Sequence, residues 1–509
     1  MAILLPLLSG CFTPSFERPK VPIARSYKWA PPAKPVHAPP GPSWKVAEPK
    51  EHLLGRGDWW KMYRDPELDR LEAAVLTANP TLAEAFGRMI QARAEVLGVK
   101  AMFYPTLDFT PWLKSVSNAA QGQWPVPPFP RQLDPWAAVG DTNYEFSLWR
   151  QLPQLRAAKE EAKAVQAAFE AIRLSLTSEV AQNYYLVRQI DLELSILDHI
   201  IGVFETDLHL TQERTRLGLG QQLDIQRARS QLEQVKGERE GLRWSRAKVE
   251  NGLAALTGES ASAFHLQPRP LAGEPPAVPA GVPSELLERR PDVARAERLM
   301  AAANEQIGVA RAAFYPSFYL AGFGGFQSLF FNTLLTLHNA YWAAGPLLDV
   351  PIFEGGRLIA GLSAAKASYW VTVQEYRKEV LAAFQEVEDY LSGIRILAEQ
   401  QRRFADAVVA SGRQVDMTMD RYRRGLANYF EIVQANKEWL TSQRDDAQTL
   451  GKRFVLTALL VKGLGGGWEE SSLRTPSSQV PKLGVSAAPA GRAPSPSSAQ
   501  PVGIPSVQP

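Results

Sequence analysis

The chain has 509 residues, and its 56 basic and 53 acidic side chains give a formal net charge of +3. Because this balance lacks the basic excess of a phosphate-binding surface, we expect no nucleic-acid partner. A single cysteine excludes an intrachain disulfide, and the six histidines show no metal-ligand spacing. After the first dozen residues the sequence contains no run of about 18 apolar residues, so we expect no transmembrane helix.

Residues 1–10, MAILLPLLSG, are apolar and end in small residues, as a bacterial secretory signal does. They lack the usual basic start, so we expect a signal-peptide remnant. The run Leu8-Ser9-Gly10-Cys11 resembles a lipobox, which predicts a lipoprotein acylated, for example with palmitate, at Cys11. The alternative is an incidental cysteine, but its position at the end of the signal-like segment favours lipidation. By resemblance to sorted lipoproteins, Phe12 indicates the outer membrane.

Both ends of the chain have compositions that do not predict a packed core. Residues 11–57, which include the proline-rich stretch from Pro31 to Pro42, predict a lipid-anchored extended linker. Residues 469–509 are rich in Ser, Pro and Ala and cannot bury enough apolar surface to fold. We therefore expect a disordered tail.

Between these ends the sequence is duplicated. Asn79–Pro105 aligns without a gap with Arg290–Pro316 at an offset of 211 residues, and Arg216–Ala228 aligns with Arg423–Ala435 at an offset of 207. Copies of roughly 200 residues are too long for a solenoid repeat and predict one unit built twice. We assign the first repeat to residues 58–257 and the second to 289–468, with a connector at 258–288.

Each copy contains a long segment that predicts a pair of helices. From Gln154 to Thr257 there is no proline, and glycine interrupts the pattern mainly at Gly218 and Gly220. Apolar residues recur every three or four positions, a period near 3.5 that predicts coiled-coil packing. A helix of about 60 residues is roughly 90 Å long, which exceeds the width of a compact domain. The second copy repeats the pattern with a turn at Gly425.

Before each helix pair the period of the sequence changes to two, which predicts strands. The predicted strands are Thr106–Lys114, Asp141–Trp149, Ser317–Gln327 and Gly345–Phe353. The third contains the glycine-rich run 322–325, for which a strand is favoured over a phosphate loop because no helix with Lys-Ser/Thr follows. Tilted strands of this length cross a bilayer, although soluble hairpins show the same alternation. The attached long helices and the outer-membrane signal favour the membrane.

The predicted strands have one polar side and are few. The polar side chains of the second strand are expected to line water, and they are Asp141, Asn143, Glu145 and Ser147. Four strands are too few for a bacterial barrel, which begins at about eight, and an open sheet edge is not tolerated in lipid. We therefore expect several copies to share one barrel.

A series of motifs stands in order along the chain: Trp59-Trp60, Asp65-Pro66-Glu67-Leu68, Asn79-Pro80-Thr81-Leu82, Arg289-Arg290-Pro291-Asp292, Pro351-Ile352-Phe353-Glu354-Gly355-Gly356-Arg357 and Gly465-Gly466-Gly467-Trp468. Together they resemble the TolC-like outer-membrane efflux proteins, in particular the NodT-type lipoprotein branch. The resemblance extends from about Cys11 to Trp468. One departure is the run 149–153, WRQLP, where the family usually has a Gly-Arg pair, so we expect a different bend there.

The resemblance implies a mainly α-helical homotrimer with a membrane β-barrel. Twelve transmembrane strands, four from each chain, would close that barrel, and a periplasmic α-helical barrel with a small mixed equatorial domain would continue it. It also implies a passive exit duct that is not an enzyme, needs no cofactor, and docks onto a periplasmic adaptor (membrane fusion) protein and an inner-membrane RND pump. Small molecules such as drugs would leave through it. The alternatives are a type I secretion channel and a structural envelope lipoprotein without a pore.

The resemblance places the turns at Gly218 and Gly425 at the periplasmic tip, where related channels close with an acidic ring and polar links. Glu431 is the candidate for the ring, and a second family position falls on the neutral Gln434. The candidate gate residues are Asp224, Asp420, Tyr422, Arg423, Arg424, Glu431 and Gln434. The alternative is a set of ordinary solvated ion pairs, each worth about 0–1 kcal/mol.

Overall fold

The structure is a computed structural model that describes residues 13–19, 21, 26–29, 58–114, 116–117, 132–133, 135–278 and 289–466. All of these belong to one compact unit, Met1–Leu473. Cys11, the stretch from Pro31 to Pro42, Trp468 and the tail 469–509 lie outside the described residues.

Each repeat contains, before its strands, a helix that starts at a proline and leads to the sheet. The first repeat has η1 (Trp59–Tyr63), α2 (Pro66–Ala78) and α3 (Pro80–Ala101), and the second has α7 (Pro291–Ala312) in the place of α3. Asp65 and Asn79 cap α2 and α3, because their side chains accept backbone hydrogen bonds from Glu67 and Leu82. Proline in the first helical turn is favoured because the N–H that it lacks would have no partner there.

The two predicted pairs of long helices are confirmed. They are α4 (Leu148–Arg216) with α5 (Gln222–Thr257), and α8 (Arg357–Arg423) with α9 (Tyr429–Gly463). At 69 and 67 residues, α4 and α8 are each roughly 100 Å long at about 1.5 Å per residue. The expected start of α4 at Gln154 was wrong, because the helix begins at Leu148 and contains Pro153 in its second turn.

In both repeats a glycine after the last long helix packs against the residue before the N-cap of the helix that leads to the sheet, and the two glycines are 207 positions apart. Gly258 and Gly465 follow α5 and α9 with φ of +74° and +91°. A Cβ at either glycine would lie 2.5 Å from a carbonyl oxygen, that of Ala78 for Gly258 and that of Arg289 for Gly465. These carbonyls are themselves 211 positions apart, immediately before the N-caps Asn79 and Arg290. The duplication therefore extends from the sequence to a shared three-dimensional contact.

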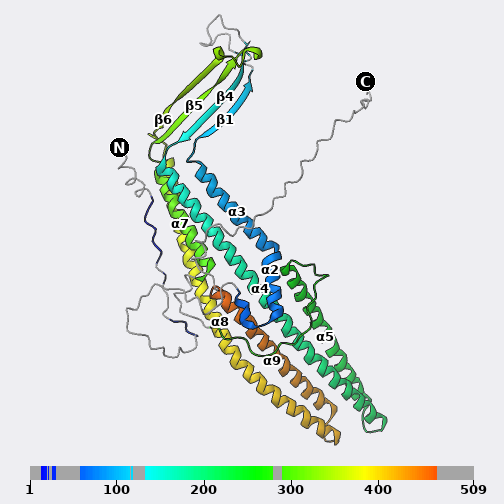
Figure 1. Cartoon of the computed structure of the whole chain (residues 1–509). Coiled ribbons are helices and arrows are strands. Elements are labelled where there is room, and N and C mark those ends of the chain that lie inside the picture. The colour runs from blue at the N-terminus through cyan, green and yellow to red at the C-terminus, as the bar shows by residue number, and fades with distance from the viewer. Residues whose placement is uncertain are drawn as a thin grey trace, which may run out of the picture. The chain divides into compact units, whose positions relative to one another are not determined.

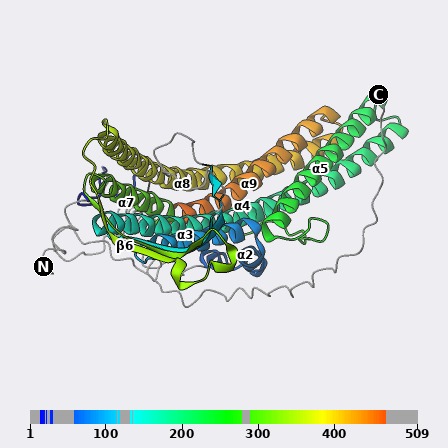
Figure 2. The same cartoon turned by 90° about the horizontal axis from the view of Figure 1, so that it is seen from above.

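The helices pack as two neighbouring pairs. Helix α4 contacts α3, α5, α7 and α9, while α8 contacts α7 and α9 (Figures 1 and 2). The four strands lie at one end of this unit, and both helix turns lie at the other (Figure 1). None of the described helices combines the length and the apolar character that a membrane crossing needs.

The strands form one antiparallel sheet in the order β1-β4-β5-β6. Their bounds are β1 (Thr106–Leu113), β4 (Trp136–Glu145), β5 (Ser317–Ser328) and β6 (Ala340–Asp349), and a short pair, β2 (Val116–Ser117) and β3 (Gln132–Leu133), follows β1 and precedes β4. The first and third strands were predicted closely, and the glycine-rich run 322–325 lies in β5. The second and fourth were predicted too late, because the chain alternates in polarity beyond the last ladder hydrogen bonds.

The sheet separates a largely polar patch from an apolar face. The register pairs Asp108 with Asp141 and Thr106 with Asn143, so these side chains and Glu145 share one face. Leu107 and Trp342 share the opposite face, where they are 82% and 80% exposed. On β5 and β6 the first face carries Phe323 and Leu347, and its charged residue is Asp349 at the end of β6. Most of the charged residues on this face therefore come from the first repeat.

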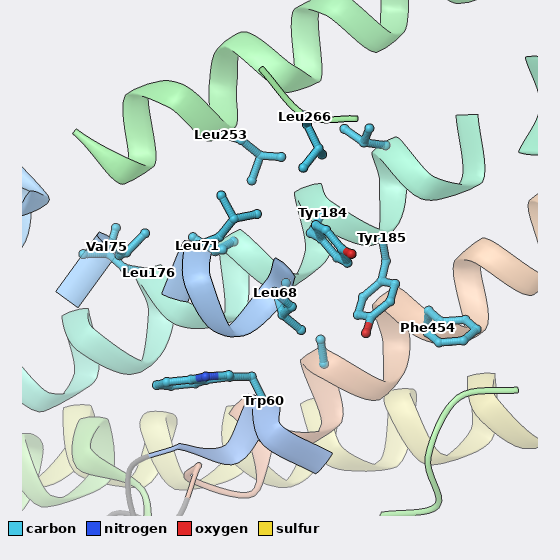
Figure 3. Packing of buried hydrophobic residues seen from close by; sticks show 14 of the residues in the cluster. Trp60, Leu68, Leu71, Val75, Leu176, Tyr184, Tyr185, Leu253, Leu266 and Phe454 are labelled. Carbon is cyan, nitrogen blue, oxygen red and sulfur yellow. The ribbon is translucent and has the colours of Figure 1, made fainter. Parts of the chain in front are cut away.

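The largest hydrophobic cluster lies where η1 and α2 meet the middle of α4 and the C-terminal parts of α5 and α9 (Figure 3). Tyr184 and Tyr185 of α4 face Leu68 of α2 and Phe454 of α9, and Leu266 of the connector completes the cluster. Within residues 58–78 and 258–278 the structure contains helices and irregular chain but no strand. The mixed character expected of an equatorial domain is therefore not seen in those residues.

The described N-terminal residues lie along α7 and α8. The Thr13 hydroxyl donates to Glu305, Arg18 forms an ion pair of 2.8 Å with Glu297, and the Lys28 amide donates to Glu388. Glu305 lies near the sheet end of α7, and Glu388 lies midway along α8. The segment thus starts beside the sheet and runs away from it.

Candidate functional site

The two helix turns have the same backbone geometry. Gly218 and Gly425 have φ of +77° and +76°, and the following leucine amides donate across the turn, Leu219 to Arg214 O and Leu426 to Arg421 O, both at 2.8 Å. These bonds satisfy carbonyls at the helix C-termini, and the left-handed conformation favours glycine. Both predicted turns are therefore confirmed as turns.

The candidate gate residues fall into different environments. Tyr422 is buried and packs edge-on against Tyr429 at 6.0 Å, while Arg214 of α4 lies 4.5 Å over the Tyr422 ring and donates to its carbonyl oxygen at 2.7 Å. This contact joins the two helix pairs. Asp420 and Arg424 pair with each other at 2.8 Å, so they form one local ion pair of α8.

Two other candidates have partners on their own helix, and Arg423 lies near a carboxylate of α4. Asp224 lies 3.6 Å from Arg227 one turn along α5, and the Gln434 amide donates to Glu438 at 3.0 Å. Exposed Arg423 stands close enough to Asp207 to oppose the rise of that carboxyl's pKa. Of the candidates, only Tyr422 therefore makes a hydrogen bond across the two helix pairs.

Glu431 has a structural role at the start of α9 that was not predicted from the sequence. Its backbone N–H donates to the side-chain oxygen of Asn428 at 3.0 Å, and its carboxylate accepts a hydrogen bond from the backbone N–H of Asn428 at 3.2 Å. The two residues form a capping box at the start of α9. The second carboxylate oxygen lies 3.5 Å from Arg421. Any test that removes the Glu431 side chain therefore perturbs the helix start together with the charge.

A polar link above the tip was missed from the sequence. Asn436 of α9 donates to Asp207 of α4 at 3.1 Å, and both side chains are buried. Burial raises the pKa of Asp207 to about 6, although the Asn436 hydrogen bond and nearby Arg423 oppose that rise. Spacing marks Asp207 as a residue on the buried face of α4, because it follows Phe204 by three positions, but spacing does not identify its partner.

The sheet end holds the other predicted site residues. Asp141 and Asn143 are exposed on one face of β4, and Glu145 is half-buried at its end. Ser147 was wrongly placed in the strand. It is buried before the first residue of α4, and its hydroxyl accepts a hydrogen bond from the Phe318 amide at 3.3 Å.

The two junctions between sheet and helix differ. Only Phe146 and Ser147 separate β4 from α4, whereas residues 350–356 separate β6 from α8. The longer junction contains Gly355 and Gly356, both with positive φ, and its Ile352 and Phe353 are 93% and 89% exposed. Across the described residues, no group of three or more His, Cys, Asp or Glu side chains is arranged to hold a metal ion.

Comparison with known proteins agrees with this architecture. The sequence profile of the family described as "Outer membrane efflux protein" matches residues 73–259 and 282–466, one match for each repeat. The chain is 27% identical over 476 residues to TtgC, a probable efflux pump outer membrane protein of Pseudomonas putida, a match that covers 93% of this chain and 96% of TtgC. It is likewise 27% identical over 481 residues to OprJ, an outer membrane protein of Pseudomonas aeruginosa, with 92% and 96% covered.

The crystal structure of the outer membrane protein VceC from Vibrio cholerae superposes with a TM-score of 0.73 at 26% identity, over 81% of this chain and 99% of VceC. A four-stranded sheet joined to two pairs of very long helices is therefore the fold of the TolC-like outer-membrane channels. The profile match covers well over half of the sequence, so the chain belongs to the outer membrane efflux protein family. That family comprises transport components and is not an enzyme family.

Proposed function

We propose that this protein is the outer-membrane exit duct of a tripartite efflux system and that three copies form the duct. The observation that carries the proposal is the sheet, which has two unpaired edge strands, β1 and β6, and a highly exposed apolar face. An open edge in lipid leaves backbone groups without hydrogen bonds, at several kcal/mol each. Other copies of the chain would supply the missing strands and close a barrel of four strands per copy.

The exposed junction residues support an assembly of copies. Ile352 and Phe353 project from the turn between β6 and α8, next to one edge of the sheet. Large apolar side chains exposed side by side mark surfaces that another molecule or the membrane covers. In the proposed trimer, the long helices of the copies would stand together as an α-helical barrel below the membrane strands.

The N-terminal segment supports the proposed lipid anchor. Thr13 lies at the sheet end of α7, next to Pro153 and Gly308, only two residues after Cys11. An acyl chain on Cys11 would therefore enter the membrane beside the strands, and each buried CH₂ would contribute about 0.8 kcal/mol to attachment. The protein would then be a lipoprotein of the outer membrane that extends into the periplasm.

The proposed partners follow from the functions for which the relatives are named. TtgC is called an efflux pump outer membrane protein, and two further relatives are called toluene and antibiotic efflux pump outer membrane proteins. We therefore assign this chain to the transport of small molecules, together with a periplasmic adaptor and an inner-membrane RND pump. These names favour small-molecule efflux over type I secretion.

The experiment that tests the proposed function is single-channel recording of the purified full-length protein in planar lipid bilayers. A duct should give discrete conductance steps, and the protein should migrate as a trimer unless it is heated. A coiled-coil lipoprotein without a pore would give neither result. Such an outcome would overturn the proposed function.

We assign Glu431 to a ring of carboxylates that keeps the resting tip narrow. The test replaces Glu431 by glutamine rather than by alanine, because glutamine retains the capping box at the start of α9 whereas alanine removes it. Glu431→Gln should therefore raise the resting conductance without destabilising α9. The matched control is Glu399→Gln, which removes a solvent-exposed carboxylate of α8 far from the turn. Equal conductance of Glu431→Gln and the wild type would refute the ring.

A further inference from the structure

An open cavity of about 520 Å³ lies where α3, α4 and the sheet meet. Thr106 pairs with Asn143 in the sheet, and Glu145 pairs with Tyr319, so these lining residues share the face that carries Asp141. The cavity therefore opens on the side that would face the lumen in the proposed duct.

The cavity wall contains two buried oxygen acceptors without a hydrogen-bond donor. One is Oε1 of Gln151, a side chain that is 3% exposed, and the other is Oε1 of Glu145. The Gln151 amide nitrogen donates to the carbonyl oxygens of Met102 and Glu145, at 3.1 and 2.7 Å. Rotating the amide would place its oxygen against these two carbonyls, so its orientation is fixed. Buried acceptors in folded proteins normally have a donor.

The nearest cation does not supply that donor. Nη1 of Arg150 lies 3.8 Å from Oε1 of Glu145, which is too long for a hydrogen bond. The Glu145 side chain remains 29% exposed, and it lines the cavity. Met102, Tyr104 and Tyr319 add an apolar and aromatic wall.

The second repeat lacks this arrangement at its own junction. There Glu354 accepts a hydrogen bond from Nε of Arg357 at 2.7 Å, and Nη2 of the same arginine is also 2.7 Å away. Both nitrogens approach the same oxygen, Oε2 of Glu354, so this carboxylate has a charge-assisted partner. Glu354 therefore provides a matched control for Glu145, at the equivalent boundary between sheet and helix.

We propose that the cavity at Glu145 and Gln151 binds amphipathic primary amines, with the ammonium group at the carboxylate and the apolar part against Met102 and the two tyrosines. An ammonium group carries three donors and no acceptor, which matches a wall that holds unpaired oxygens. A small number of polar groups in an otherwise apolar pocket is the usual composition of a small-molecule site. The inference rests on the proposed function, because it names a class of cargo that contacts the duct wall.

Calorimetric titration of the full-length protein with 2-phenylethylamine tests the site. The amine should bind, 2-phenylethanol should bind at least about tenfold more weakly, and Glu145→Gln should weaken amine binding by at least about tenfold, because hydrogen bonds to charged groups are the stronger class. Glu354→Gln should retain wild-type affinity. Migration of unheated Glu145→Gln as a trimer serves as the check that this variant still folds and assembles.

The outcomes separate the site from the proposed function. A wild-type protein that conducts but does not bind the amine overturns the site and leaves the duct intact. Equal binding of the amine and the alcohol, or equal loss in Glu145→Gln and Glu354→Gln, also overturns it. Amine binding that is lost in a Glu145→Gln protein that still migrates as a trimer supports it.

Discussion

Replacing Asp207 by asparagine should stabilise the contact between α4 and α9, and the gain should depend on pH. Asp207 is buried and accepts from Asn436, and its pKa is raised from 3.8 to about 6 mainly by burial. A carboxyl whose pKa is higher in the folded state destabilises that state wherever it is ionised. The penalty is therefore absent below about pH 4 and complete above about pH 6.

The magnitude follows from the two pKa values. At about 1.4 kcal/mol for each tenfold change in the proton equilibrium, the rise from 3.8 to about 6 corresponds to about 3 kcal/mol. Asparagine can keep the hydrogen bond from Asn436, because its side-chain oxygen also accepts, and it carries no charge at any pH. The opening of this contact should therefore become roughly 100-fold rarer in Asp207→Asn at pH 8.

Amide hydrogen exchange followed by mass spectrometry measures this opening locally, in peptides covering residues 200–211 and 430–440. Wild type and variant are compared at the same pH, so the intrinsic exchange rates cancel. The control is Asp198→Asn, which removes another carboxylate of α4, an exposed one that pairs with Arg239 of α5, and it should change protection little. Lower protection in Asp207→Asn at pH 8, or a difference that does not vary with pH, would refute the reasoning.

Two further predictions concern stability. Gly258→Ala and Gly465→Ala should each lower the unfolding temperature, because the new Cβ meets a carbonyl oxygen at 2.5 Å and φ is positive. Gly252→Ala, inside α5 and with open space around the new Cβ, should instead stabilise by about 0.5–1 kcal/mol. Glu72→Met should raise the unfolding temperature by the equivalent of about 1–3 kcal/mol, since both carboxylate oxygens are buried and unpaired. Burial raises the pKa of Glu72, so this gain should grow from pH 5 to pH 9, and a loss of stability at pH 9 would contradict it.

The sequence predicted the parts of the fold that local periodicity encodes. The repeat, the two helix pairs and the turns at Gly218 and Gly425 follow from residue spacing and from the conformational freedom of glycine. The ends of β4 and β6 were missed because alternation continues through Phe146 and Leu148, where the backbone already leaves the sheet. At these ends the side chains still alternate in polarity, although the backbone no longer makes the hydrogen bonds of the sheet.

The contacts between repeats could not be predicted from spacing. Asp207 and Asn436 lie 229 positions apart, and Arg214 meets Tyr422 only because α4 packs beside the second helix pair. The capping role of Glu431 was readable, since Asn428 and Glu431 stand three residues apart as the motif requires. The cavity at Glu145 depends on the ending of β4 two residues before α4, which the sequence placed too late.

Closure of the sheet between copies is the step on which the proposed duct depends. In a Cys11→Ser background, Thr110→Cys on the edge strand β1 can be combined in turn with Tyr341→Cys, Ala343→Cys or Gly345→Cys on the opposite edge strand β6. These positions share one face of the sheet, whereas Phe109→Cys points to the other face and is the control. At least one pair should oxidise to covalent trimers on a non-reducing gel, because paired strands bring Cα atoms within disulfide range. Monomers alone in every combination, or equal cross-linking through Phe109→Cys, would contradict a barrel shared among copies.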